Sequence, residues 1–264
     1  MIGLRAHDYG KQPAIDLFTA IKNDGWKAIQ LAFPKAIEGV DSFTDVTPEI
    51  VDNTKSTLTQ TGLHVAVLGV YVDPSLVDEK ERIKNRNFLA MALPQVKELG
   101  AGCVGTETTN RGNHSSLTAL YRTLEELLPE AENLGVNIGI EPVHWHNLCS
   151  PELAKKMLSD LSSPSLKIIF DPINLLTPDA VKSQNELWKR CIDCFGEYIV
   201  AVHIKGTTGK SNDIGMMDDS VFTESILDYE YLFSLLKPIN VPILREGTSP
   251  AHAELDIEFL RKFL

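Results

Sequence analysis

The sequence has few cysteines, no long apolar run and a shortage of basic side chains. Among its 264 residues, 25 Lys and Arg stand against 36 Asp and Glu, which gives a formal net charge of -11. Proteins that bind nucleic acids hold the phosphate groups with clusters of Lys and Arg. We therefore expect no nucleic-acid partner.

Two further absences bear on location. The most apolar run, residues 63–72, is about half of the roughly 20 residues that a membrane-spanning helix needs. The first seven residues lack the basic start and the apolar stretch of a signal peptide. These features predict a cytoplasmic protein with no membrane partner.

The four cysteines do not indicate a metal site of their own. Cys191 and Cys194 form a C-x-x-C pair, but no second pair completes the four ligands that are typical of structural zinc. The pair falls within a helical pattern, so we expect buried thiols on one face of a helix.

Short apolar runs alternate regularly with longer amphipathic ones. Strands alternating with helices indicate parallel pairing, and eight such units without a long linker favour a closed barrel. The predicted fold is α/β, a single (β/α)8 TIM barrel that forms one domain over residues 1–264. An open, doubly wound dinucleotide fold lacks its G-x-G-x-x-G motif here. The expected strands are residues 2–6, 28–33, 63–72, 103–106, 136–141, 166–171, 198–204 and 241–245.

The four late strands end in polar residues. In a barrel, the carboxyl ends of the strands form the floor of the active site. Because side chains alternate along a strand, each polar residue shares its inward direction with the residue two positions earlier. The polar residues are Glu141, Asp171, His203 and Glu246, and their small or aliphatic counterparts are Gly139, Ile169, Ala201 and Leu244.

Three carboxylates that converge on an apolar floor lose hydration and repel one another. Each costs several kcal/mol or shifts its pKa sharply unless it is paired. A divalent cation removes that cost. Three carboxylates and one imidazole suit a fairly hard metal, so we expect one Mn²⁺ or Mg²⁺ ion, with Co²⁺ and Zn²⁺ as alternatives. Taken singly, each residue also fits a plainer role as a helix cap, a turn residue or a core histidine.

With their neighbours, these residues resemble those of the xylose-isomerase-like barrels. The matching segments are Glu141, Asp171-Pro172-x-Asn174, His203-Ile204-Lys205-Gly206 and Glu246-Gly247. The superfamily holds sugar epimerases of the tagatose 3-epimerase type, hydroxypyruvate isomerase, inosose dehydratase and endonuclease IV. The resemblance implies that the four strand-end residues bind one metal, commonly Mn²⁺, and that Glu141 and Glu246 act as acid and base.

The implied activity is that of a metal-dependent isomerase or epimerase of a small sugar or sugar derivative. The metal would chelate a carbonyl and a neighbouring hydroxyl, and it would stabilise the enediolate that forms when one glutamate removes a proton. The other glutamate would return the proton from the opposite face for epimerisation, whereas proton movement between adjacent carbons would give isomerisation.

Two positions depart from the epimerase pattern. Asn174 stands where those enzymes have a His, and Asn147 stands where they have a Glu. Both positions hold substrate oxygens, so the sugar stays undetermined, and dehydration of an inosose or keto-sugar is the alternative activity. Weaker alternatives are an endonuclease IV-like nuclease and a non-catalytic sugar-binding barrel. Self-association into a homo-oligomer also stays open.

Several residues at strand ends are candidates for contacting the substrate. Lys205 shares the inward direction of His203, so it would bind a substrate oxygen or phosphate, or neutralise Glu246. The loop of residues 206–220 lies where barrels often bind phosphate, but it has no strong phosphate motif. The substrate-binding candidates are His7, Glu107, His144, Trp145, Asn147, Asn174 and Lys205.

Overall fold

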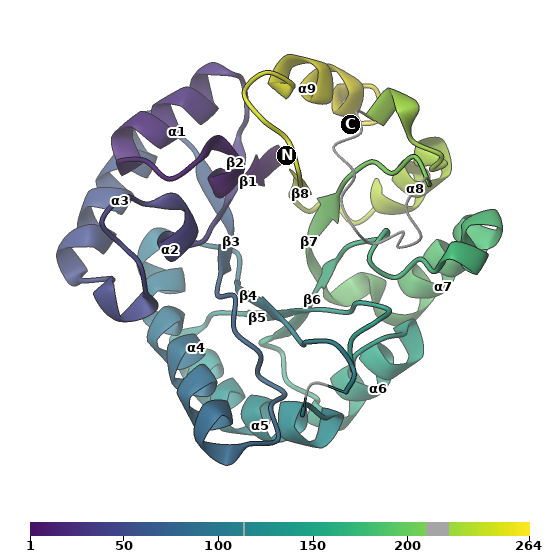
Figure 1. Cartoon of the computed structure of the whole chain (residues 1–264), viewed down its shortest axis with the longest axis horizontal. Helices are drawn as coiled ribbons and strands as arrows, with labels where there is room; N and C mark the ends of the chain where they lie inside the picture. Colours follow the sequence, from purple (N-terminus) through teal and green to yellow (C-terminus); the bar gives the residue numbers. More distant parts are fainter. Residues whose placement is uncertain (113, 210–221) are drawn as a thin grey trace.

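The chain forms a closed barrel of eight parallel strands, which confirms the predicted TIM-barrel fold (Figure 1). The structure is a computed structural model, and it describes residues 1–112, 114–209 and 222–264. Each strand pairs with the next in the sequence, and the first pairs with the last, with Ile2 beside Ile243. The strands are β1 (Ile2–Arg5), β2 (Ala28–Leu31), β3 (His64–Gly69), β4 (Val104–Glu107), β5 (Ile138–Glu141), β6 (Leu166–Phe170), β7 (Ile199–Ile204) and β8 (Ile243–Arg245).

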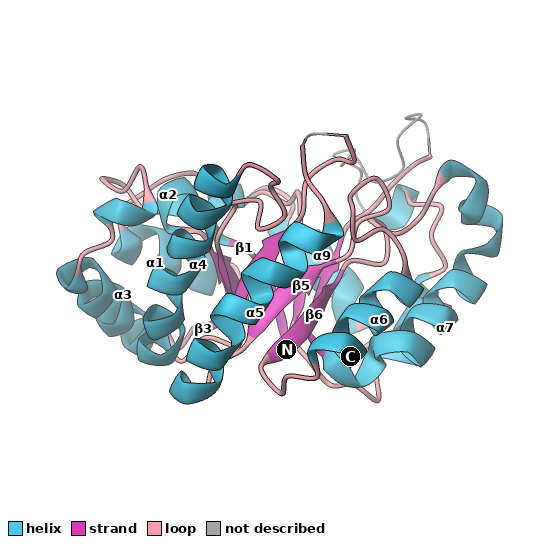
Figure 2. Ribbon diagram, turned by 90° about the horizontal axis from the view of Figure 1, so that it is seen from below, coloured by secondary structure: helices cyan, strands magenta, loops and turns pink. Residues whose placement is uncertain are grey.

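Helices surround the barrel on its outside, as Figures 1 and 2 show from two directions. Proline and polar caps start several of them, because the first helical N–H groups need acceptors that lie outside the helix. The Thr47 side chain caps α3, and Ser150 caps α6 just before Pro151. The α-helices of the described residues are α1 (Ala14–Asn23), α2 (Phe33–Ala36), α3 (Pro48–Thr61), α4 (Glu79–Leu99), α5 (Leu117–Leu134), α6 (Pro151–Leu161), α7 (Gln184–Phe195), α8 (Tyr229–Leu236) and α9 (Ala253–Arg261).

Seven of the eight strands are shorter than the apolar runs that predicted them, and β4 has the predicted length but lies one residue later. The run 63–72, for example, yields a strand only over His64–Gly69. Val70 and Val72 lie beyond the strand end, and Val70 is fully buried. Apolar composition therefore reports burial there, although the Val70 backbone N–H still donates to the Gly105 carbonyl of β4 at 2.8 Å. Cys191 and Cys194 lie in α7 as free thiols, as expected, but only Cys191 is buried, while Cys194 is partly exposed.

The core has two parts. The larger part fills the space between strands and helices, and the smaller one fills the inside of the barrel. The inner part includes Ile169, Ala201 and Leu244, which confirms the inward direction expected for these residues. A Cβ atom added at Gly139 would lie 2.9 Å from Ile169 Cγ1, so glycine is needed for Ile169 to fill the barrel beneath the site.

No helix in the described part of the chain is both long and apolar enough to cross a membrane.

Candidate metal centre and active site

The four predicted metal ligands meet at the carboxyl ends of the strands. Glu141 is the last residue of β5, Asp171 directly follows β6, His203 lies in β7 and Glu246 directly follows β8. Parallel strands in a closed barrel all bring their carboxyl ends to the same mouth. All four residues are buried, with exposed fractions between 0% and 7%.

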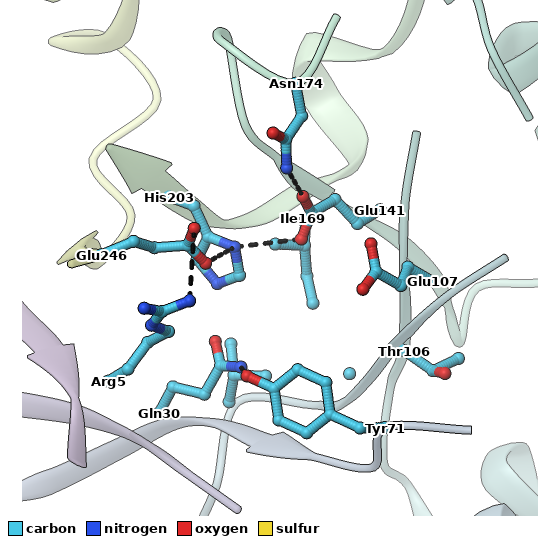
Figure 3. A pocket seen from close by; sticks show the side chains of 12 residues that line it. Arg5, Gln30, Tyr71, Thr106, Glu107, Glu141, Ile169, Asn174, His203 and Glu246 are labelled. Atoms are coloured by element: carbon cyan, nitrogen blue, oxygen red, sulfur yellow. Dashed lines mark hydrogen bonds and ion pairs between the residues drawn. The ribbon is translucent and has the colours of Figure 1, made fainter. Parts of the chain in front are cut away.

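His203 lies between the two glutamates, which are turned toward each other in Figure 3. Its Nδ1 atom is 3.0 Å from Glu141 Oε2 and 3.1 Å from Glu246 Oε1. Its buried Nε2 atom has no hydrogen-bonding partner among the described residues. Glu141, Asp171 and His203 each offer one ligand atom, and these atoms all lie within 4.8 Å of one another.

Lys205 is an internal cation of this site and is only 3% exposed. Its Nζ atom lies 2.8 Å from Asp171 Oδ2 and 3.3 Å from Glu246 Oε2, and it donates to Asn174 Oδ1 at 2.7 Å. An ammonium group has three donors. Because all three face protein oxygens, this arrangement supports the neutralising role that we considered for Lys205.

Asn174 connects the lysine to the first glutamate. Its Nδ2 atom donates to Glu141 Oε1 at 2.5 Å, while its Oδ1 atom accepts from Lys205. The turn that carries it is fixed by Asp171 Oδ1, which accepts from the backbone N–H groups of Ile173 and Asn174 at 2.8 and 3.0 Å. Asn174 therefore lies in the pocket, as expected. Hydrogen bonds to Glu141 and Lys205 fix the orientation of its side-chain amide.

Arg5 is a site residue that sequence reasoning missed. It ends β1, its Nη1 atom is 3.6 Å from Glu246 Oε2, and it forms a two-bond contact with Asp8. Asp8 in turn accepts from the N–H of Gly247. The predicted fold could have indicated Arg5. In a closed barrel β1 and β8 are neighbours, so a residue at the end of β1 must lie close to Glu246, which follows β8.

A pocket opens above these groups, and Figure 3 shows its walls. Gln30 and Tyr71 belong to it although the sequence did not single them out, and Gln30 donates to the Tyr71 hydroxyl at 2.7 Å. The residues that line the pocket are Arg5, Gln30, Val67, Tyr71, Gly105, Thr106, Glu107, Glu141, Ile169, Asn174, His203 and Glu246.

Burial and charge act in opposite directions on the ionisable groups. Burial alone lowers the pKa of the His203 imidazolium, but the carboxylates of Glu246 and Glu141 outweigh it and raise the pKa to about 9. Burial alone raises the pKa of Glu246, but Lys205, His203 and Arg5 outweigh it, and the pKa lies well below its ordinary value. The pKa of Asp171 is raised by burial, against the attraction of Lys205. The cations therefore keep Glu246 ionised in a site from which water is largely excluded.

Glu107 faces Glu141 across the paired ends of β4 and β5. Enclosure in the barrel mouth, with Glu141 and Glu246 nearby, raises the pKa of Glu107 to about 8, although 41% of its side-chain surface still faces open space. Its predicted position in the pocket agrees with the structure.

Four other substrate-binding candidates do not line this pocket. His7 packs its ring edge-on against Tyr71, with centroids 5.8 Å apart. The backbone N–H of His144 bonds to the Asn174 carbonyl at 2.7 Å, and Trp145 packs against the His144 ring. Asn147 donates to Ser115 Oγ. These residues therefore make contacts within and between the loops that follow the strands. The sequence indicates only that they follow a strand end, and not which partners they contact.

The loop of residues 206–220, considered above for phosphate binding, lies largely outside the described residues, because residues 210–221 are not described. Of its start, Thr207 is fully buried, and its backbone N–H bonds to Ser225 Oγ at 3.1 Å.

The donor set fits a divalent cation. Three buried carboxylates converge with an imidazole whose Nε2 atom has no hydrogen-bonding partner among the described residues. Glu141, Asp171 and His203 would hold the ion, and Glu246 stands beside them on the same imidazole nitrogen.

A family model described as "Xylose isomerase-like TIM barrel" matches residues 18–263. No curated protein sequence matches the chain. Among solved structures, a D-tagatose 3-epimerase-like protein is 18% identical, with a TM-score of 0.77 over 99% of this chain and 96% of the other. The D-allulose 3-epimerase of Methylomonas sp. is 17% identical, with a TM-score of 0.74 over 100% and 97%. The IolI protein with a bound zinc atom is 15% identical, with a TM-score of 0.67 over 99% and 95%. At these identities the likeness to solved structures concerns the fold.

Proposed function

Because this chain belongs to the xylose isomerase-like TIM barrel family, we propose that it is a divalent-metal-dependent isomerase or epimerase of a small sugar or sugar derivative. Two of the similar structures are named for ketose 3-epimerases, D-tagatose 3-epimerase-like and D-allulose 3-epimerase. The observation that carries the proposal is the pair of buried carboxylates, Glu141 and Glu246, that face each other across His203.

Two carboxylates on opposite sides of a substrate carbon suit proton removal and return. Glu246 is held ionised by Lys205, His203 and Arg5, so its carboxylate is free of a proton and is able to accept one from the substrate. One carboxylate oxygen of Glu141 accepts a hydrogen bond from the Asn174 amide, and the other lies against His203 Nδ1. These two contacts fix the orientation of the carboxylate in the wall of the pocket.

A bound divalent cation would supply Lewis acidity, which polarises a substrate carbonyl and stabilises the charge left by proton removal. The chain's own part is to hold both carboxylates in place and to limit the access of water. The same set of groups would also serve loss of a β-hydroxyl, that is, dehydration of a keto-sugar. The mass of the product separates the two reactions, because dehydration removes one water.

The test is hydrogen exchange with solvent. The protein is stripped with EDTA, reloaded with Mn²⁺ and incubated in D₂O with a panel of unphosphorylated ketoses, and deuterium uptake is followed by NMR. We expect uptake at the carbon next to the carbonyl, with dependence on the metal. Glu246→Gln should reduce uptake by at least a hundredfold, whereas Glu254→Gln, an exposed residue of α9, should leave it unchanged. The absence of exchange with every ketose, with metal present, contradicts the proposal.

A further inference from the structure

A second cavity adjoins the pocket on the side of β3 and β4. Its volume is about 310 Å³, compared with about 100 Å³ for the pocket above the metal-site residues. Tyr71 and Glu107 line both cavities, so the two cavities meet at these side chains. One water occupies roughly 30 Å³, and small-molecule sites measure about 300–1,000 Å³, so the second cavity has room for a substantial part of a ligand.

Two buried polar atoms in its wall lack partners. Thr108 is fully buried and His146 is 7% exposed. Thr108 Oγ1 and His146 Nδ1 have no hydrogen-bonding partner among the described residues. Glu107 Oε2 is the near neighbour of His146 Nδ1, at 3.9 Å, which is too long for a hydrogen bond. Buried polar atoms are nearly always paired, so these two indicate a ligand group or an ordered water beside them in this wall.

The carboxylate of Asp73 behaves differently in the same wall. Its Oδ1 atom accepts from the backbone N–H of Ser75 at 2.7 Å, and its Oδ2 atom accepts from Thr109 at 2.6 Å. Both carboxylate oxygens of Asp73 already accept hydrogen bonds from the protein, so Asp73 forms part of the cavity wall and is not left without partners. Among the described residues that line this cavity, the buried side-chain atoms without a partner belong to Thr108 and His146.

The lining also restricts the charge of the occupant. Among the described residues, no Lys or Arg lines the second cavity, whereas Asp73 and Glu107 do. A phosphate group would therefore meet two acidic side chains in the lining itself, while the Lys35 ammonium lies over the ring of Tyr71, 3.5 Å from its centroid. A sugar hydroxyl both donates and accepts, so it suits the Thr108 hydroxyl and either tautomer of His146.

We propose that the substrate is a ketose that carries a second, neutral sugar unit, and that this unit binds in the second cavity through Thr108 and His146. The inference rests on the proposed function, since it places the reacting carbons between Glu141 and Glu246. It extends that function by naming the substrate class as glycosylated and unphosphorylated.

The test compares three probes by calorimetry on the Mn²⁺-loaded protein: D-fructose, the glucosyl-fructose disaccharide maltulose, and D-fructose 6-phosphate. We expect maltulose to bind at least tenfold more tightly than either of the others. Thr108→Val and His146→Gln should each weaken maltulose binding about 3- to 10-fold, which is the usual effect of one lost hydrogen bond, and should change fructose binding less than twofold. Two independent variants keep the test valid if one fails to fold.

The matched control is Thr54→Val. Thr54 Oγ1 is also buried, with no hydrogen-bonding partner in the part of the chain that the structure describes, but it lies in α3 and lines neither cavity. This variant should leave all three affinities unchanged. Equal affinity for fructose and maltulose, tighter binding of the phosphate, or site variants that behave like Thr54→Val would overturn the inference.

Deuterium exchange separates this inference from the proposed function. Deuterium exchange with fructose, without tighter binding of maltulose, would contradict the inference of a second sugar unit and would still support the proposed enzyme activity. Maltulose binding that depends on Thr108, without exchange on any sugar, would support the cavity assignment and remove the activity.

Discussion

Lys205 determines the charge balance of the site at the scale of single residues. It is buried against Asp171 and Glu246, two of the predicted metal ligands. Removing one partner of a buried ion pair leaves an uncompensated charge and typically costs about 3–5 kcal/mol. A divalent cation carries charge of the same sign as Lys205, so the two should compete in neutralising the carboxylates.

Replacing Lys205 by Met should therefore affect the metal-free protein most. We expect Lys205→Met to lower the free energy of unfolding by about 3–5 kcal/mol in EDTA, and by less with Mn²⁺ present. The increase in Tm on adding Mn²⁺ should be larger in this variant than in the wild type, and thermal unfolding with and without metal measures it. Lys156→Met removes an exposed ion pair with Asp160 and should change stability by less than about 1 kcal/mol. An equal Mn²⁺ effect in Lys205→Met and wild type would contradict the competition.

His146 should make the fold sensitive to mild acid. Burial, partly offset by the carboxylates of Glu141 and Asp73, lowers the pKa of its imidazole from 6.5 to about 4. The unfolded chain takes up this proton below about pH 6.5, but the folded chain does so only near pH 4. The contribution to stability is complete above pH 6.5 and is lost as the pH falls toward 4.

The measurement is the urea midpoint at pH 7 and at pH 5 in the presence of EDTA. The wild type should lose more stability between these two values than His146→Gln, because the variant has no imidazole to titrate. The same loss in both proteins would show that His146 does not contribute.

At the scale of elements, the inside of the barrel depends on small residues beneath the site. A Cβ added at Gly139 of β5 would lie 2.9 Å from Ile169 and 3.0 Å from Cys103 Sγ. Overpacking of this kind typically costs about 1–3 kcal/mol. We expect Gly139→Ala to lower the urea midpoint accordingly, and Ile169→Val, which removes a methyl group from the crowded side chain, to restore part of the loss in the double variant. Additive losses in the double variant would contradict steric crowding as the cause.

The features of these elements that the sequence predicted depend on residues that are close together in the sequence, and the features that it missed depend on residues that are far apart. Alternation along a strand is local, so the inward direction of Glu141, Ile169 and His203 was predictable once the strands were recognised. Arg5, Gln30 and Tyr71 were missed, because they reach the site only when β1, β2 and β3 close against β8 and β4. The loop contacts of His144 and Asn147 were missed for a similar reason, since partners such as Ser115 are 32 positions away from Asn147.

At the scale of the whole molecule, closure of the ring joins the two ends of the chain. Ile2 of β1 pairs with Ile243 of β8, and a buried ion pair between Arg245 and Asp256, at 3.1 Å, holds α9 to β8. The last strand and helix therefore complete both the barrel and its outer layer. They also carry Glu246, so the proposed site is assembled only when the ring is closed.

This arrangement bears on the prediction that residues 1–264 form one domain. If they do, a chain shortened to residues 1–242 cannot close the ring, because β1 and β7 each lose a hydrogen-bonded neighbour. Exposed edge strands and an open core should then prevent a cooperative fold. We expect the full chain to unfold in one thermal transition, detected together by circular dichroism and by tryptophan fluorescence, and the shortened chain to show none. A cooperative transition in the shortened chain would mean that the first seven strand–helix units are stable without the eighth, and would contradict a single domain that depends on ring closure.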